Sequence, residues 1–553
     1  MENLKITFLG GVGEIGKNMT AFEYGNDIIL VDCGSAFPND NMPGIDLVVQ
    51  DISYLLANKN KIRGIFFTHG HEDHIGSVPY VLSQIKLPLY GSRMTLALVE
   101  NKLRETSIKN IKMTSVKGGS VVSAGNFKVE FVNMTHSIPG AMALVITTPV
   151  GVVVHTGDFK IDFTPIAGDG CDLKRLAEVG KKGVLLFMSD STNIERDGFS
   201  MSESVVGKTM DTLFNKYRDK RIFIATFSSN VHRLQQIMDI SQKYNRKVVF
   251  GGRSMINVAD IAIKLGELKC DRKNIVDIEK IEKYEDKELV IITTGSQGEE
   301  MSALTRISTD NFPRIRLDNN DVVIFSSAPI PGNEKSINTV INNLYRRDCT
   351  VIYNELADVH ASGHANREEI KIMHSLIKPK YFLPVHGEYR HLKKQQLLAM
   401  ELGMKQMNTL IPEIGMQVEV NKNLLKPARM VQAGEILLDG TGAGDIESNV
   451  LRDRKILSED GICVVVLNLS EFSRKFIGQP DIISRGLIYQ DEANELITQA
   501  KEFITKGLEG VDLKDMDTAE IKALVKKVAT SFFSKKTKRR PMIVTIIVNR
   551  EEK

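Results

Sequence analysis

The chain has 553 residues, too many for one hydrophobic core, so about two to four domains are expected. Its composition, 42% hydrophobic and 25% charged, is that of an ordinary globular protein, and no apolar run of about 18 residues suggests a membrane span. Five scattered cysteines form no disulfide framework, which favours the cytoplasm, and a net charge of +3 predicts that any nucleic-acid contact is a local patch.

The first predicted elements are strands around a glycine-rich loop. Strands are expected at residues 4–9, 19–24 and 28–32, and the N-terminus lacks the shape of a signal peptide. The loop from Gly11 to Gly16 spells G-x-G-x-x-G, with Asp32 following as in dinucleotide-binding folds. That motif must open a helix, whereas a β-hairpin follows here. A nucleotide cofactor is therefore not expected.

A cluster of metal-binding side chains follows the next predicted strand, residues 64–68. Its sequence is His69-Gly70-His71-Glu72-Asp73-His74. Imidazole and carboxylate are zinc ligands, and the first two histidines, two residues apart, can hold one ion. Asp73 and His74 can reach a second ion, and two ions that share a water form a phosphodiester-cleaving arrangement. For a single histidine, a solvated polar loop would be the better interpretation.

The pattern changes beyond about residue 205 to repeated strand, polar loop and helix. Strands at 222–226 and 322–325 each lead into such a loop, which indicates a parallel sheet whose loops gather at one edge. Metal-type residues resume only afterwards, at His360, His364 and His386. The region is therefore predicted to be a domain inserted into the first one.

A smaller α/β module is predicted from about residue 450. It has a strand at 462–467, helices near 491–507 and 517–534, and a last strand at 542–548.

The hexapeptide is the signature of the metallo-β-lactamase superfamily, and nearly the whole chain resembles the ribonuclease J family within its β-CASP branch. The resemblance implies an α/β fold, in which a metallo-β-lactamase αββα sandwich carries an inserted β-CASP parallel α/β domain and a small C-terminal α/β domain. The implied boundaries are 1–204 and 361–440 for the sandwich, 205–360 for the insert, 441–455 for a linker and 456–553 for the C-terminal domain.

The resemblance also implies the remaining metal ligands. His136 follows a strand and precedes a proline-containing loop, Asp158 matches the bridging carboxylate, and His386 closes the second position. The expected ligands are His69, His71, His136 and Asp158 for one ion, and Asp73, His74, Asp158 and His386 for the other. Two zinc ions per subunit are implied, with manganese as an alternative, and Asp73 would also orient the attacking hydroxide. His155 is interpreted as structural.

The residues expected to contact the substrate lie in three segments. Residues 358–364 resemble the H-x-S-G-H motif of the family, whose second histidine, His364, would contact the scissile phosphate and assist the leaving group. Asp190 matches an acidic motif that orients a site histidine, although alone it would suit a turn or cap. A pocket for a 5′-monophosphate is implied at Ser228, Ser229, Asn230, His360, Ala361, Ser362, Gly363 and His364. By themselves, residues 228–230 suit a plain helix N-cap.

Some relatives also hold a structural calcium, whose matching positions here are Pro43, Ile45 and Asp439. Sites built largely from backbone carbonyls leave little sequence trace.

The expected function is a zinc-dependent ribonuclease with 5′–3′ exonuclease and endonuclease activity on single-stranded RNA, preferably 5′-monophosphorylated, in mRNA decay and rRNA maturation. Alternatives are a weakly active RNA-binding scaffold subunit and a DNA-directed β-CASP nuclease. A small-molecule lactamase or thioesterase would not need the insert of roughly 150 residues or the C-terminal module.

The C-terminal module resembles the oligomerisation region of the family at Arg485-Gly486 and Arg540-Pro541-Met542, while its final strand departs in detail. A homodimer or homotetramer is expected, alone or with a paralogue or RNA-decay complex, and no membrane partner is expected. The basic run Lys535–Arg540 suits either a solvated helix tail or a contact with RNA or another subunit.

Overall fold

The computed structural model describes residues 2–39, 41–168, 170–297, 299, 302–329, 333–440, 448–487 and 490–550. The chain forms two compact units, residues 1–36 with 49–435 and residues 37–48 with 436–553. Within these described ranges, no helix combines the length and apolar character that crossing a bilayer requires.

Two β-sheets pack face to face in the first unit. The eight-stranded sheet has the order β20-β19-β1-β2-β3-β5-β6-β7, with β1 Leu4–Gly10, β2 Met19–Tyr24, β3 Asp27–Val31, β5 Ile62–Phe66, β6 Leu89–Gly91, β7 Met113–Ser115, β19 Met416–Asn421 and β20 Leu424–Met430. The six-stranded sheet has the order β18-β12-β11-β10-β9-β8, with β8 Val121–Ala124, β9 Phe127–Asn133, β10 Met142–Thr148, β11 Gly151–His155, β12 Leu186–Asp190 and β18 Tyr381–Val385. Phe8, Phe66 and Phe131 are among the fully buried side chains between them.

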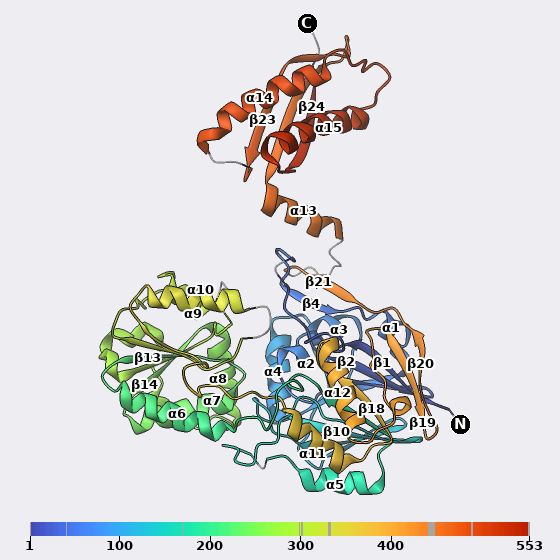
Figure 1. Ribbon diagram of the computed structural model, residues 1–553, viewed down its shortest axis with the longest axis vertical. Coiled ribbons are helices and arrows are strands. Elements are labelled where there is room, and N and C mark those ends of the chain that lie inside the picture. Colours follow the sequence, from blue (N-terminus) through green and yellow to red (C-terminus); the bar gives the residue numbers. More distant parts are fainter. Residues whose placement is uncertain are drawn as a thin grey trace. The chain divides into compact units, whose positions relative to one another are not determined.

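Helices cover the outer face of each sheet, which gives the predicted αββα sandwich (Figure 1). The helices on the eight-stranded sheet are α1 Ser53–Ala57, α3 Val78–Gln84 and α4 Arg93–Arg104, and those on the six-stranded sheet are α5 Leu173–Lys182, α11 Arg367–Ile377 and α12 Tyr389–Glu401. The short helix α2 Glu72–Ile75 begins within the histidine cluster.

The inserted region is a five-stranded parallel sheet in the order β14-β15-β13-β16-β17, as the βα rhythm predicted. Its strands are β13 Arg221–Ala225, β14 Lys247–Gly251, β15 Leu289–Thr293, β16 Asp321–Phe325 and β17 Thr350–Ile352. The helices α6 Glu203–Lys216, α7 Val231–Lys243 and α8 Arg253–Leu265 pack on one face, and α9 Ala303–Ser308 and α10 Glu334–Tyr345 on the other.

The chain returns from the insert to the strand that precedes it. β18 pairs in parallel with β12, so that Asp190 lies opposite Val385 and the carboxyl ends of the two strands meet. Asp190 and the residue after β18, His386, are therefore brought to the same edge of the sheet, although 195 positions separate them in sequence.

The second unit contains a three-stranded sheet, in the order β23-β22-β24, covered on one face by two helices. Its elements are α13 Ser448–Asp460, β22 Ile462–Ser470, β23 Phe476–Arg485, α14 Gln490–Leu508, α15 Thr518–Thr537 and β24 Met542–Arg550. β23 was not predicted from the sequence. Part of the expected linker, residues 448–455, lies in α13, and residues 441–447 lie outside the described residues. The short strands β4 Leu47–Gln50 and β21 Glu435–Leu438 pair with each other.

Candidate metal centre

Three imidazoles converge where β5 and β9 end. Nδ1 of His71 lies 3.0 Å from Nε2 of His69 and 3.1 Å from Nε2 of His136. All three ring nitrogens are within ligand distance of a common point, so they can hold one metal ion.

A second group of ligands lies beside the first. Nε2 of His386 lies 3.1 Å from Oδ2 of Asp73, and Nε2 of His74 lies 3.2 Å from Oδ2 of Asp158. The same Asp158 oxygen is 3.8 Å from Nε2 of His69 in the first group. Asp158 therefore lies between the two groups, at the position that the resemblance implied for a bridging carboxylate.

The carboxylate of Asp158 fits this role because its close polar neighbours are the ring nitrogens of the candidate ligands themselves, His74 at 3.2 Å and His386 at 3.5 Å. Both of its oxygens are buried without a hydrogen-bond partner. A buried, unpartnered carboxylate is costly unless a cation balances it. The donor set of imidazoles and carboxylates therefore fits two zinc ions, with Asp158 shared between them.

The surroundings set the protonation of the ligands. Burial and the neighbouring imidazoles lower the pKa of His69 and His136 well below the usual value, and burial lowers the pKa of His71 to about 4. These three rings are therefore neutral, the form that binds a metal. Burial also acts to lower the pKa of His74 and His386, but the adjacent carboxylates, Asp158 above all, outweigh it and raise both.

Hydrogen bonds to the far side of each ring orient the ligand histidines. Nδ1 of His74 donates to Oδ2 of Asp32 at 2.8 Å, which leaves Nε2 for the metal. Asp32 in turn accepts from the backbone N–H and the hydroxyl of Thr68, each at 2.8 Å. Nδ1 of His136 donates to the carbonyl oxygen of Gly363 at 2.6 Å. Sequence reasoning considered Asp32 only as part of a false dinucleotide motif.

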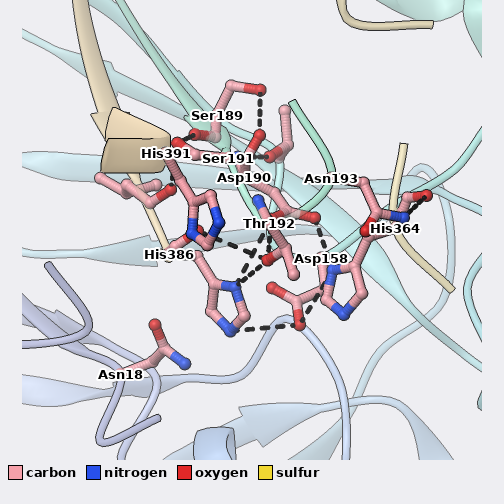
Figure 2. Close-up of polar contacts among 12 residues, drawn as sticks. Asn18, Asp158, Ser189, Asp190, Ser191, Thr192, Asn193, His364, His386 and His391 are labelled. Carbon is pink, nitrogen blue, oxygen red and sulfur yellow. Dashed lines mark hydrogen bonds and ion pairs between the residues drawn. The ribbon is translucent and has the colours of Figure 1, made fainter. Parts of the chain in front are cut away.

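The segment after β12 connects His386 with His364, as Figure 2 shows. The hydroxyl of Thr192 lies 2.7 Å from Nδ1 of His386 and donates to Oδ1 of Asp190 at 2.7 Å. The other oxygen of Asp190 accepts from Nδ1 of His364 at 2.8 Å. Burial acts to lower the pKa of His364, but Asp190 outweighs it and raises that pKa. Asp190 is thus placed to orient His364, and the role that the motif implied for it stays a prediction.

Asn193 ties the same segment to the H-x-S-G-H residues. Its Nδ2 donates to Oγ of Ser362 at 2.8 Å and to the carbonyl oxygen of His364 at 3.1 Å. The sequence analysis assigned no role to Thr192 or Asn193. Their polar side chains directly after Asp190 were the available signal.

The other residues expected in the 5′-monophosphate pocket differ in burial and in their contacts. Asn230 is buried and caps α7, its Oδ1 accepting from the N–H of Arg233 at 3.0 Å, so it fulfils the simpler N-cap interpretation. Ser228 hydrogen-bonds Ser254 at 2.9 Å, and Ser229 is partly exposed. Arg233 also donates to the carbonyl oxygen of Val359 at 2.8 Å, which links α7 to the segment that begins at His360.

His360 and Ala361 are partly and fully buried, respectively. Burial and the Arg233 charge lower the pKa of His360 to about 3, so this ring is neutral near neutral pH.

The glycine-rich loop supports the metal centre instead of a nucleotide. An antiparallel hairpin of β2 and β3 follows it, and the carbonyl oxygen of Gly11 accepts from the N–H of His386 at 2.8 Å. His155 is buried beside the ligands, where its Nδ1 accepts from the N–H of Gly157 at 3.0 Å, consistent with a structural role.

The predicted calcium positions surround a cation of the chain itself. The guanidinium of Arg454 contacts Asp439 and donates to the carbonyl oxygens of Pro43 at 3.3 Å and Gly44 at 2.9 Å. Ile45 follows directly in the same turn. As arranged, these oxygens do not fit calcium without movement of Arg454, and the prediction stays untested.

The sandwich fold and the paired ligand groups define a hydrolase of the metallo-β-lactamase class. Four family descriptions match the chain: "Metallo-beta-lactamase superfamily" at residues 12–189, "Ribonuclease J, beta-CASP domain" at 219–344, "Zn-dependent metallo-hydrolase RNA specificity domain" at 351–412, and "Ribonuclease J C-terminal domain" at 449–550.

Similar proteins extend the match over nearly the whole chain. The chain is 39% identical to ribonuclease J2 of Bacillus subtilis over 99% of both chains, and 39% identical to ribonuclease J 1 of Streptococcus pyogenes over 98% of this chain and 96% of that one. A solved protein of unknown function from Enterococcus faecalis shares the fold, with a TM-score of 0.53 at 17% identity, over 76% of this chain and all of that one. The chain belongs to the ribonuclease J family.

Proposed function

We propose that this protein is a zinc-dependent ribonuclease that cleaves single-stranded RNA, both 5′ to 3′ from a 5′-monophosphorylated end and internally, in mRNA decay and rRNA maturation. The observation that carries the proposal is Asp158, a buried carboxylate without a hydrogen-bond partner among the described residues, which lies between two ligand groups and beside the His364–Asp190 pair. Family membership supplies RNA as the substrate class.

In the proposed site, His69, His71, His136 and Asp158 hold one zinc ion, and Asp73, His74, Asp158 and His386 hold the other. When bound, the ions supply Lewis-acid stabilisation of charge on the phosphate oxygens and lower the pKa of a nearby water. Manganese is the alternative metal. The side chain of Asp73 is 28% exposed, and it would also orient the attacking water.

His364 is the proposed catalytic acid. Its Nδ1 is held by Asp190, which raises the pKa of the ring against the effect of burial and favours a proton on it. Nε2 is then the atom that gives a proton to the departing oxygen of the RNA chain. Asp190 acts through His364 and is therefore a positioning residue.

The proposed 5′-monophosphate pocket consists of residues 228–230 and 360–364. Ser362 supports this assignment because Asn193 fixes its hydroxyl beside His364, where it can donate to a phosphate oxygen. Ser228 and Ser229 offer hydroxyls near the N-terminus of α7, where backbone N–H groups favour anions. Asn230 contributes through the cap that positions this helix end.

The proposed domain boundaries are residues 1–204 with 361–440, 205–360, 441–455 and 456–553. We also propose a cytoplasmic location, because all five cysteines are free, and a homodimer or homotetramer, alone or with a paralogue or RNA-decay complex.

The test uses one single-stranded RNA with a 5′-monophosphate, a 5′-hydroxyl or a 5′-triphosphate, with and without chelator. The expected result is chelator-sensitive release of mononucleotides, fastest from the monophosphorylated RNA. Metal-dependent cleavage without any preference for the 5′ group would contradict the end pocket alone. Binding of RNA without cleavage, with zinc or manganese, would favour a scaffold subunit, and cleavage of DNA alone would favour a DNA nuclease.

Two variants test the metal assignment. His71→Ala and Asp73→Ala each remove one ligand, so cleavage should fall by at least about 10³-fold, while the far-UV circular dichroism stays unchanged. A suitable control is His391→Ala in α12, whose ring hydrogen-bonds the backbone N–H of Glu388 and belongs to neither ligand group. Turnover that survives in either ligand variant would overturn the two-metal site.

A further inference from the structure

Basic side chains gather at one end of the three-stranded sheet in the second unit. β23 ends at Arg485 and β24 begins at Met542, and both residues pair with Ile462, the first residue of β22. The end of α15 leads through Lys538 into the start of β24. We call the resulting group the basic edge; it consists of Arg485, Lys535, Lys536, Lys538, Arg539 and Arg540.

Backbone contacts fix the shape of this edge. A guanidinium N–H of Arg539 donates to the carbonyl oxygen of Leu487 at 3.0 Å, and the backbone N–H of Arg540 donates to Asp460 at 3.1 Å. These bonds join the segment after α15 to the chain at both neighbouring strand ends. The cations therefore stand on a defined surface and not on a loose tail.

The charges of the basic edge are not neutralised within the unit. All six side chains are exposed, and none forms an ion pair with a described residue. Residues 518–540 hold eight basic residues and one acidic residue, whereas residues 490–517 hold eight acidic and three basic residues. Basic residues in the last turn of a helix interact favourably with the helix dipole, which explains why Lys535 and Lys536 lie there. This effect does not extend beyond the last turn, so it does not explain the positions of Arg485 and Arg540.

The kind of partner follows from what the edge lacks. Protein interfaces usually have an apolar centre, but the described segments 460–462, 485–487 and 535–542 hold no large exposed hydrophobic residue. The nearest exposed apolar side chains, Ile483 and Val544, lie two positions along the strands, on the sheet face opposite the helices. Cations alone suit a phosphate backbone, where released counterions drive binding.

We propose that the basic edge binds the phosphate backbone of single-stranded RNA, as a second contact apart from the metal centre. This inference rests on the proposed function, because the ribonuclease activity is what brings RNA to the protein. The C-terminal unit would then add phosphate contacts that retain long substrates between successive cuts.

The test compares two triple variants of the full-length, zinc-loaded protein. The edge variant carries Lys535→Gln, Lys536→Gln and Arg540→Gln. The control variant carries Lys522→Gln, Lys526→Gln and Lys527→Gln, which remove the same charge from exposed positions in the first half of the same helix. Binding is measured by fluorescence anisotropy over a range of salt concentrations, with phosphorothioate RNA to prevent cleavage. One RNA has about 30 nucleotides and the other about four, fewer than most single binding grooves cover.

For the long RNA, removing three phosphate contacts should lower the slope of log Kd against log salt by about 2 in the edge variant. The control variant should keep the wild-type slope, and both variants should bind the short RNA like the wild type. An unchanged slope in the edge variant, the same loss in the control, or equal losses with both RNAs would overturn the proposal.

Light scattering, which measures the molar mass of each variant, separates RNA binding from a subunit contact. If the edge variant loses RNA affinity only because its molar mass falls, the surface is a subunit contact and the proposal is wrong. An unchanged mass together with the lower slope supports it. Failure of the wild-type protein to cleave or bind any RNA would instead contradict the proposed function itself.

Discussion

The side-chain amide of Asn193 lies 2.8 Å from the hydroxyl oxygen of Ser362 and 3.1 Å from the carbonyl oxygen of His364. The buried amide of Asn193 thus donates twice to residues 360–364, the segment proposed to contact the terminal phosphate. Asn193 is therefore placed to hold Ser362 and His364 at a fixed separation.

Asn193→Asp keeps the size of the side chain but replaces the two donors by an acceptor. Leaving buried groups unpaired costs about 1–3 kcal/mol. kcat/KM for 5′-monophosphorylated RNA should therefore fall by roughly 10- to 100-fold, with a smaller fall for 5′-hydroxyl RNA. Bound zinc, measured by mass spectrometry, should not change. An equal fall in kcat/KM for the two RNAs, or a loss of bound zinc, would show that Asn193 stabilises the whole site and not the phosphate-binding segment in particular.

Asp32→Asn tests whether Asp32, which is not itself a proposed metal ligand, orients the ligand His74. Asp32 accepts from Nδ1 of His74 at 2.8 Å, and an amide in its place can present the wrong group to the ring. Zinc affinity should fall by about 10- to 100-fold for one of the two ions, as measured by titration with a competing chelator. Asp27→Asn is the matched control, because Asp27 begins β3, the strand that Asp32 follows, but pairs with Arg63. Wild-type affinity for both ions in Asp32→Asn would contradict this role.

Gly363→Ala tests the close approach of the substrate segment to a ligand. A Cβ atom at this position would lie 2.6 Å from Cε1 of His136, and the backbone conformation there is one that alanine adopts freely. Displacing the ring should lower both bound zinc and cleavage by at least about tenfold. Gly251→Ala at the end of β14, where the new Cβ meets only ordinary contacts at 3.5 Å, should leave both unchanged. Full zinc occupancy in Gly363→Ala would show that the segment can move away.

His374 predicts how stability depends on pH. Burial lowers its pKa to about 4, and its ring packs between Phe187 and Phe382. Between about pH 6.5 and 4 the unfolded chain binds a proton that the folded protein does not, so acid favours unfolding. This residue alone should remove up to about 3 kcal/mol of stability as the pH falls through that range.

The measurement is urea unfolding of wild type and His374→Phe at several pH values. Because His374 lies outside the metal centre, the difference between the two proteins isolates its contribution. The wild type should lose more stability on acidification than the variant. Parallel pH profiles would mean that His374 takes up a proton in the folded protein without cost.

Several features were predicted correctly because they depend on residues close in sequence. The hexapeptide from His69 to His74 spans one short loop and the first turn of α2, so its side chains stay close together whatever the rest of the chain does. The β-hairpin after the glycine-rich loop and the parallel sheet of the insert also follow from local alternation and from repeated βα units. The fold class, which was predicted from these local patterns and from the resemblance, was confirmed by the sheet topology and the family matches.

Other features were not predicted because they depend on strands that meet only in the folded chain. Asp32 reaches His74 because β3 and β5 are neighbours, and Asp190 meets His386 because β12 and β18 are neighbours. β23 was missed, and with it the position of Arg485 beside the basic run that follows α15.

The sequence by itself indicated the first four candidate metal ligands, His69, His71, Asp73 and His74, because a short segment holds them together at little cost in chain entropy. It also identified the family, whose motifs are local. Only the tertiary structure decided which polar groups orient those ligands and which cations share one surface. Such contacts join segments far apart in the chain, and sheet pairing and core packing select them from many alternatives that the sequence leaves open.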